Sequence, residues 1–126
     1  MSKAGEWVLL AEDEIHIAKL VIFKLEKEGY QVVHAKDGRE AIARLPEQIW
    51  ATIILDVMMP HCDCWEVLRT VRASELTKTT PVLMLTAKAM PQDQANSASL
   101  GATEFLRKPF DPAELARSVG RLVGRL

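Results

Sequence analysis

The sequence lacks the features that mark several classes of protein. Only two of its 126 residues are cysteines, Cys62 and Cys64, too few for a disulfide scaffold and typical of a reducing compartment. No apolar run approaches the roughly 20 residues of a membrane-spanning helix, and the N-terminus has no hydrophobic signal segment. Sixteen Lys and Arg against 17 Asp and Glu leave a net charge of −1, without the basic excess that attracts nucleic acids or anionic membranes. We therefore expect a cytoplasmic chain that binds neither DNA nor a membrane directly.

The composition is that of one globular domain. Hydrophobic residues make up 48% of the chain and charged residues 26%, with 6 glycines and 6 prolines, so a packed core is expected. A chain of 126 residues is too short for two domains of ordinary size. We expect a single domain over residues 1–126, with an ordered core over about residues 6–125 and no output domain in this chain.

Short apolar runs alternate five times with longer segments of helical periodicity. Continuous apolar runs of this length are typical of strands buried on both faces. The expected strands are 7–11, 30–33, 52–55, 81–85 and 103–106. This alternation predicts an α/β fold, a doubly wound parallel sheet of five strands with five helices on its two faces.

Helix signals separate the strands. In the first helix, apolar residues recur at i, i+3, i+4 and i+7, and Gly29 follows as a stop signal; these apolar residues are Ala18, Val21, Ile22 and Leu25. Asp37, with Glu40 three residues later, and Asp111, followed by a proline, are expected N-caps of the second and fifth helices. The third helix is expected around residues 68–72, the fourth over 92–100 and the fifth over 112–126.

Chemically active residues stand where the expected strands end. Glu12 and Asp13 follow the first strand, Asp56 the third, Thr86 the fourth and Lys108 the fifth, so all should meet at one edge of the sheet. Crowded carboxylates need a cation to neutralise them, and an oxygen-only set suits Mg²⁺. Beside such a cation, with the ammonium and hydroxyl in reach, the Asp56 carboxylate could attack phosphorus and form an aspartyl phosphate.

These strand ends resemble the receiver domain of bacterial response regulators over essentially the whole chain. Each motif alone is weak, but four of them in order, closing strands one, three, four and five, are specific. The motifs are Ala11-Glu12-Asp13-Glu14, Leu55-Asp56-Val57-Met58-Met59-Pro60, Leu85-Thr86-Ala87 and Arg107-Lys108-Pro109-Phe110.

The resemblance implies a fold and a phosphoryl acceptor. The fold would be flavodoxin-like, (β/α)5, with strand order 2-1-3-4-5. Asp56 would accept a phosphoryl group from a phosphohistidine on a sensor histidine kinase or a histidine phosphotransfer protein. Mg²⁺, for which Mn²⁺ could substitute, would be held by Glu12, Asp13, Asp56 and the backbone carbonyl of Met58.

The resemblance also implies a switch. Thr86, Ala87 and Lys108 would bind the phosphoryl oxygens, and Phe105 would be the aromatic that turns inward when Thr86 moves. The peptide bond before Pro109 would be cis. Permanent core packing of Phe105 is the alternative to a mobile switch.

The resemblance implies roles for four further positions, in the lifetime of the phosphate and in contact with the kinase. Met58 and Lys88, two residues after Asp56 and Thr86, would set the lifetime of the phosphate by controlling access of water. Ile17 and Leu20 lie off the apolar stripe of the first helix and would contact the kinase; the alternative is scattered surface hydrophobes.

The output surface would be the fourth helix, fifth strand and fifth helix. Phosphorylation would switch this surface for binding a partner or for forming a homodimer, with Glu104, Arg117 and Arg121 as candidate pairs across a dimer interface.

Three positions depart from the family's usual pattern. Glu12 stands where many receivers have Asp, and its longer side chain could reach the metal through water. Cys64 replaces the usual glycine after the third strand, so we expect an altered loop there. Phe105 lacks the hydroxyl of the tyrosine that is common at the switch position.

Four other functions fit these residues less well. A degenerate receiver acting only as an interaction module would not need all five site residues. A haloacid-dehalogenase-type phosphohydrolase would carry Asp-x-Asp-x-Thr and a cap domain, and a flavin-binding flavodoxin would not place acidic residues after its first strand. A soft-metal site at His61, Cys62 and Cys64 lacks a second ligand pair. His16 and His34 are expected at surface or boundary positions.

Overall fold

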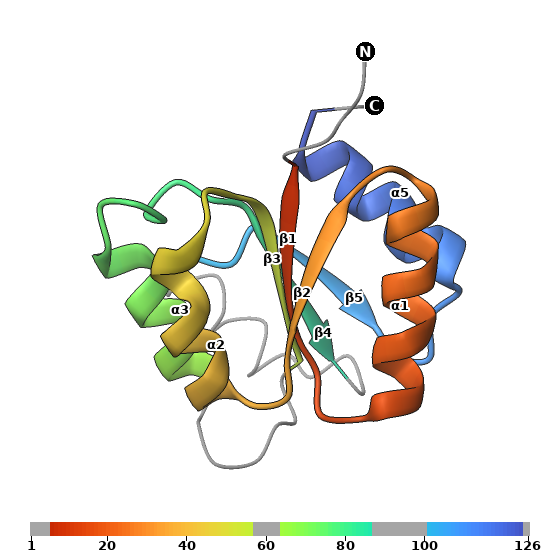
Figure 1. The fold of residues 1–126 in the computed structure, drawn as a ribbon, viewed down its shortest axis with the longest axis horizontal. Helices are drawn as coiled ribbons and strands as arrows, with labels where there is room; N and C mark the ends of the chain where they lie inside the picture. Colours follow the sequence, from red (N-terminus) through yellow and green to blue (C-terminus); the bar gives the residue numbers. More distant parts are fainter. Residues whose placement is uncertain (1–5, 57–63, 87–100, 125–126) are drawn as a thin grey trace.

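The fold was analysed in a computed structural model, which describes residues 6–56, 64–86 and 101–124 (Figure 1). In chain order, the elements alternate between strand and helix. They are β1 (Trp7–Ala11), α1 (Ile15–Lys27), β2 (Gln31–Ala35), α2 (Gly38–Arg44), the 3-10 helix η1 (Leu45–Glu47), β3 (Trp50–Asp56), α3 (Cys64–Ala73), β4 (Val82–Thr86), β5 (Glu104–Arg107) and α5 (Pro112–Leu122).

The strands form one parallel five-stranded sheet in the order β2-β1-β3-β4-β5. Figure 1 shows α1 and α5 on one face of this sheet and α2 and α3 on the other. The doubly wound, flavodoxin-like fold with strand order 2-1-3-4-5 is thereby confirmed. The fourth helix, expected over residues 92–100, lies outside the described residues. Among the helices that are described, none has both the length and the hydrophobicity to cross a bilayer.

Two apolar clusters fix the helices to the sheet. On one face, Ala18, Val21 and Leu25 of α1 and Leu115 and Val119 of α5 pack together against the strands. On the other face, residues of α2 and α3 pack against the opposite side of the strands. Because both faces of the sheet are covered, the central strands β3 and β4 are almost wholly apolar, as parallel sheets require.

Several element boundaries differ from the prediction for identifiable reasons. β2 begins at Gln31 because the amide of Tyr30 donates a hydrogen bond of 3.1 Å back to the Leu25 carbonyl of α1. Gly29, at φ 97°, supplies the left-handed residue that this helix end needs. α5 ends at Leu122, earlier than expected, and Gly124 follows with φ 85°.

The two predicted N-caps are confirmed. The Asp37 side chain accepts a hydrogen bond of 2.8 Å from the Glu40 amide, and the Asp111 side chain accepts one of 2.8 Å from the Ala113 amide. Each cap satisfies a backbone donor that the first turn of a helix leaves without a partner. Asp111 therefore fixes where α5 starts, just after the segment that carries Lys108.

Arg72, near the end of α3, donates hydrogen bonds to two loops, one before β4 and one before β5. Its guanidinium donates to the Gly101 carbonyl from Nε at 2.9 Å and from Nη2 at 2.6 Å, and to the Thr80 carbonyl from Nη1 at 2.6 Å. A Cβ on Gly101, whose φ is 101°, would come within 2.9 Å of Arg72 Nε. Burial lowers the pKa of Arg72, yet a guanidinium stays charged at neutral pH. Arg72 thus holds the chain just before β5 against the loop before β4.

Replacing Arg72 with methionine is expected to lower the free energy of unfolding by about 2 kcal/mol, because it leaves half-buried carbonyls without a charged donor. Urea denaturation followed by circular dichroism measures the change. Arg69→Met, at an exposed position of the same helix, is the matched control and should change little. Equal stability of the two variants would show that the Arg72 hydrogen bonds add nothing.

Candidate functional site

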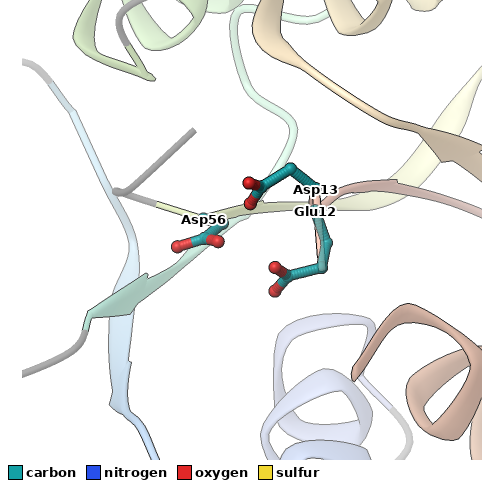
Figure 2. Close-up of side chains that lie close together, drawn as sticks. All are labelled: Glu12, Asp13 and Asp56. Atoms are coloured by element: carbon teal, nitrogen blue, oxygen red, sulfur yellow. The ribbon is translucent and has the colours of Figure 1, made fainter. Parts of the chain in front are cut away.

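Three carboxylates meet at the carboxyl edge of the sheet. Glu12 and Asp13 directly follow β1, and Asp56 is the last residue of β3. One oxygen of each lies within 4.8 Å of the others, and Figure 2 shows the three groups around one space. Glu12 and Asp56 are buried, at 0% and 1% exposure, whereas Asp13 is exposed. The adjacent strands β1 and β3 thus bring together the acidic residues that the sequence places at their ends.

The backbone continues the sheet past β1 and so fixes Glu12. The Glu12 amide donates to the Ala35 carbonyl at 3.0 Å, which extends the pairing of β1 with β2 by one residue. Its side-chain oxygen Oε2 accepts a hydrogen bond of 3.1 Å from the Glu14 amide. The backbone of Glu12 is therefore held by β2, and its carboxylate by the Glu14 amide.

Lys108 closes the site from the segment after β5. Its ammonium Nζ lies 3.0 Å from Asp56 Oδ2 and 3.2 Å from Glu12 Oε1, and its side chain is 16% exposed. The Lys108 amide donates to the Thr86 carbonyl at 2.6 Å, which ties this segment to the end of β4. The peptide bond between Lys108 and Pro109 is cis.

The charges at this edge do not balance. Burial raises the pKa of Glu12 to about 7, helped by hydrogen bonding to Asp56 and by the negative charge of Asp56. Burial lowers the pKa of Lys108, but its contacts with Asp56 and Glu12 outweigh this effect and raise the pKa above the ordinary lysine value. Lys108 therefore stays protonated, and one ammonium among the described residues faces three carboxylates.

The donor set fits a hard divalent cation. Glu12 Oε1 is buried and, among the described residues, accepts no hydrogen bond, although the Lys108 ammonium is within ion-pair distance. A buried anionic oxygen without such a bond is costly, and a cation would offset that cost. Carboxylate oxygens without His or Cys are ligands of the kind that Mg²⁺ and Mn²⁺ accept. Glu12, Asp13 and Asp56 could hold the cation.

The other expected site residues are only partly within the described chain. Thr86 ends β4 and is buried at 5% exposure; since Asp56 pairs with Leu85, Thr86 lies one residue beyond this pair. Phe105 pairs with Met84 on β4 and is half-buried against the cluster of α2 and α3. Three expected residues lie outside the described part of the chain: Met58, Ala87 and Lys88. Cys64 is the first residue of α3.

An apolar groove adjoins the Lys108 side of the site. Its volume is about 340 Å³, and it runs between α1 and the start of α5. Its lining residues are Glu14, Ile17, Leu20, Lys108, Pro109, Phe110 and Pro112. Leu20 is 58% exposed and Ile17 is half-buried. The two residues expected to contact a kinase thus line one surface that reaches Lys108.

One contact beside the site was not predicted from the sequence. His34, on β2, lies with its ring Nε2 2.7 Å from the Glu12 carbonyl oxygen. The sequence suggested only a boundary position, and His34 is indeed half-buried. The available signal was the register, since β2 next to β1 pairs His34 with Leu10, two residues before Glu12.

Comparison with known proteins identifies the family. Residues 8–120 match the family described as the response regulator receiver domain. The chain belongs to this family. It is therefore a receiver domain, a phosphorylatable switch of two-component signalling, in agreement with the order of its site residues along the strands.

Solved receiver structures superpose closely on this receiver domain. The chemotaxis protein CheY4 of Vibrio cholerae is 38% identical, with a TM-score of 0.90, over 94% of this chain and 99% of that one. The receiver domain of the sensor histidine kinase PA1611 from Pseudomonas aeruginosa is 33% identical, with a TM-score of 0.87, over 96% of this chain and 99% of that one. In that structure a magnesium ion is coordinated in the active-site cleft.

Curated relatives of the receiver domain are longer. The alkaline phosphatase synthesis transcriptional regulatory protein PhoP of Bacillus subtilis is 37% identical over 118 residues, which are 94% of this chain and 48% of that protein. The phosphate regulon transcriptional regulatory protein PhoB of Escherichia coli is 33% identical over 94% of this chain and 52% of that protein. The chain spans about half the length of these relatives.

Proposed function

We propose that Asp56 is the phosphoacceptor of this receiver domain. The observation that carries the proposal is the contact of Asp56 Oδ2 with the Lys108 ammonium at 3.0 Å, in a cluster with Glu12 and Asp13. Asp56 is buried at the end of a central strand, which holds its carboxylate rigidly. A positioned carboxylate facing a cation is the arrangement that attack on a phosphoryl group needs.

The proposed reaction is a transfer from a phosphohistidine. An oxygen of Asp56 bonds to phosphorus while the phosphorus–nitrogen bond of the donor breaks, and its electron pair leaves with the imidazole. The Lys108 ammonium first pairs with Asp56 and then binds a phosphoryl oxygen, and the Thr86 hydroxyl donates a hydrogen bond to another. The domain thereby assists its own phosphorylation, without acting on a separate substrate in repeated turnovers.

Glu12, Asp13 and Asp56 are proposed to hold Mg²⁺, or Mn²⁺ in its place, with the Met58 carbonyl as a further ligand. When bound, the ion supplies positive charge against the negative charge that collects on the phosphoryl oxygens. The magnesium ion in the PA1611 receiver supports this assignment. Ala87 is proposed to contact the phosphoryl group, and Met58 and Lys88 to set its lifetime.

The phosphoryl group is proposed to act through β4 and β5. Pulling Thr86 and Lys108 toward new anionic oxygens changes two segments that are already joined by a hydrogen bond of 2.6 Å between their backbones. Phe105 is half-buried on β5, and it is proposed to turn inward to a second packing position when Thr86 moves. Such a change shifts a two-state equilibrium by a few kcal/mol at most.

The phosphodonor is proposed to dock on the apolar groove along α1. Ile17 and Leu20 line this groove together with Lys108, so a protein seated there brings its phosphohistidine to the site. A sensor histidine kinase or a histidine phosphotransfer protein, in the cytoplasm, is the partner that the transfer requires.

A homodimer through β5 and α5 is a second proposed consequence of phosphorylation. Glu104 and Arg121 form an ion pair within one chain, and Arg121 also donates to Ser118 at 3.1 Å. A dimer that used these residues would have to exchange this internal pair for one across the interface. Arg117 is exposed and has no ion pair with the part of the chain that the structure describes.

Incubation with acetyl phosphate and Mg²⁺ is expected to add the mass of one phosphoryl group, because Asp56 and its cation need no protein donor for the chemistry. Intact-protein mass spectrometry measures the gain, and peptide mapping should place it on Asp56. Chelation of the cation with EDTA is the control and should prevent the gain. A domain that acts only as an interaction module would remain unmodified under both conditions.

A further inference from the structure

A histidine on the neighbouring strand contacts the backbone of the metal site. His34 Nε2 lies 2.7 Å from the carbonyl oxygen of Glu12. A carbonyl oxygen only accepts hydrogen bonds, so Nε2 carries the proton and donates. The contact is short and partly buried, conditions under which a hydrogen bond restrains its partners.

With this hydrogen bond, β2 contacts the Glu12 backbone at two points. The Glu12 amide already donates to the Ala35 carbonyl at 3.0 Å, so both polar backbone groups of Glu12 are held by consecutive residues of β2. The Glu12 carbonyl belongs to the planar peptide unit that also contains the Asp13 nitrogen. Fixing that oxygen therefore fixes the plane that joins the two acidic residues.

The geometry of this peptide matters for the cation. Mg²⁺ demands near-ideal octahedral coordination at short distances, so a rotated plane between Glu12 and Asp13 would misplace one carboxylate relative to the other. Asp13 is exposed, and its own side chain is not held by packing to the degree that the buried Glu12 is. The orientation of the peptide unit between Glu12 and Asp13 therefore restrains the position from which the Asp13 side chain extends.

We propose that His34 is a positioning residue for the divalent-cation site, acting through the Glu12 carbonyl and not as a ligand. This inference rests on the proposed Mg²⁺ binding of Glu12, Asp13 and Asp56. Residues that orient metal ligands typically change affinity by about 10–100-fold when removed. Because His34 acts on a backbone group of a ligand residue, we expect an effect at the low end, about three- to tenfold.

Magnesium affinity of three variants tests the proposal. His34→Leu removes the donor, and His34→Gln keeps an amide N–H at about the reach of Nε2, whereas His34→Asn is polar but too short to reach the carbonyl. Isothermal titration calorimetry with MgCl₂ on the whole chain gives the dissociation constant of each. His16→Leu, at an exposed position of α1, is the matched control.

The expected result is weaker Mg²⁺ binding by His34→Leu and His34→Asn, with affinity restored by His34→Gln and unchanged in the control. Urea denaturation without metal distinguishes the positioning role from a purely structural one. If His34 were only structural, the variants would lose stability, and His34→Gln would not restore Mg²⁺ affinity. Should the leucine variant fail to fold, the asparagine variant carries the comparison.

Wild-type affinity in the variants that lack the donor, or no rescue by glutamine, would overturn the role of His34 while leaving the metal site intact. Absence of any Mg²⁺ binding by the unaltered chain would instead overturn the metal site itself, and the role of His34 with it.

Discussion

Asp56→Asn is expected to lose phosphorylation by acetyl phosphate completely. The asparagine amide has the same shape as the carboxylate but is a poor nucleophile, and it offers the cation one neutral oxygen in place of a charged one. Lys108 would keep its ion pair with Glu12, whose Oε1 lies 3.2 Å from Nζ. Intact-protein mass spectrometry with Mg²⁺ present measures the loss against the unaltered domain.

The informative control is the neighbouring carboxylate. Asp13 is exposed and one of its oxygens lies within 4.8 Å of an Asp56 oxygen, so Asp13 is the carboxylate to check for phosphorylation in error. Asp13→Asn should weaken cation binding and slow the gain of mass, yet the label should still map to Asp56. A persistent label on Asp56→Asn, at Asp13 or elsewhere, is incompatible with the proposed acceptor.

Much of this site follows from the topology alone. Consecutive runs of apolar residues predicted the parallel strands, and parallel strands bring their carboxyl ends to one edge. That rule places Glu12, Asp13 and Asp56 together without any knowledge of side-chain contacts. It also explains why Lys108, which is 52 residues from Asp56 in sequence, reaches the same carboxylate.

Contacts that depend on side-chain direction did not follow from the sequence. His34, on β2, reaches the Glu12 carbonyl at the end of the adjacent strand β1, which depends on register and on the rotamer of the ring. Arg72 donates to carbonyls in two loops, and loop carbonyls carry no sequence signal. The Glu104–Arg121 ion pair was expected between chains because charge alone does not say whether a partner belongs to the same molecule.

Element ends were predicted less well than elements for a related reason. β2 was expected to begin at Tyr30, which is apolar and buried at 4% exposure, but its amide completes the end of α1 by bonding to Leu25. Hydrophobicity reports burial, whereas a strand boundary is set by where the backbone hydrogen bonds go. The position of Asp56, at the last residue of β3, is insensitive to such shifts because the buried strand itself fixes it.

Without divalent cations, the domain is expected to become less stable as the pH rises from about 5 to about 8. In the folded state Glu12 holds its proton up to a pKa of about 7, whereas the ordinary pKa of a glutamate side chain, as in the unfolded chain, is 4.5. Between these values the folded state binds more protons than the unfolded state, so the free energy of unfolding falls with increasing pH. At 1.36 kcal/mol for each unit of pKa, the loss is at most about 3 kcal/mol. Urea denaturation at several pH values in EDTA measures it.

Glu12→Gln is the control that assigns this dependence. The amide is nearly isosteric and has no proton to lose, so the variant should keep most of its metal-free stability at pH 8 and have a flatter profile. Saturating MgCl₂ should restore the stability of the unaltered domain at high pH, because the ion binds the ionised carboxylates of the folded state and not the unfolded chain. The same addition should do little for Glu12→Gln. Two outcomes would contradict this assignment: a metal-free stability that rises from pH 5 to pH 8, or a pH profile that Glu12→Gln leaves unchanged. Either would mean that the Glu12 carboxyl group does not cause the pH dependence of stability.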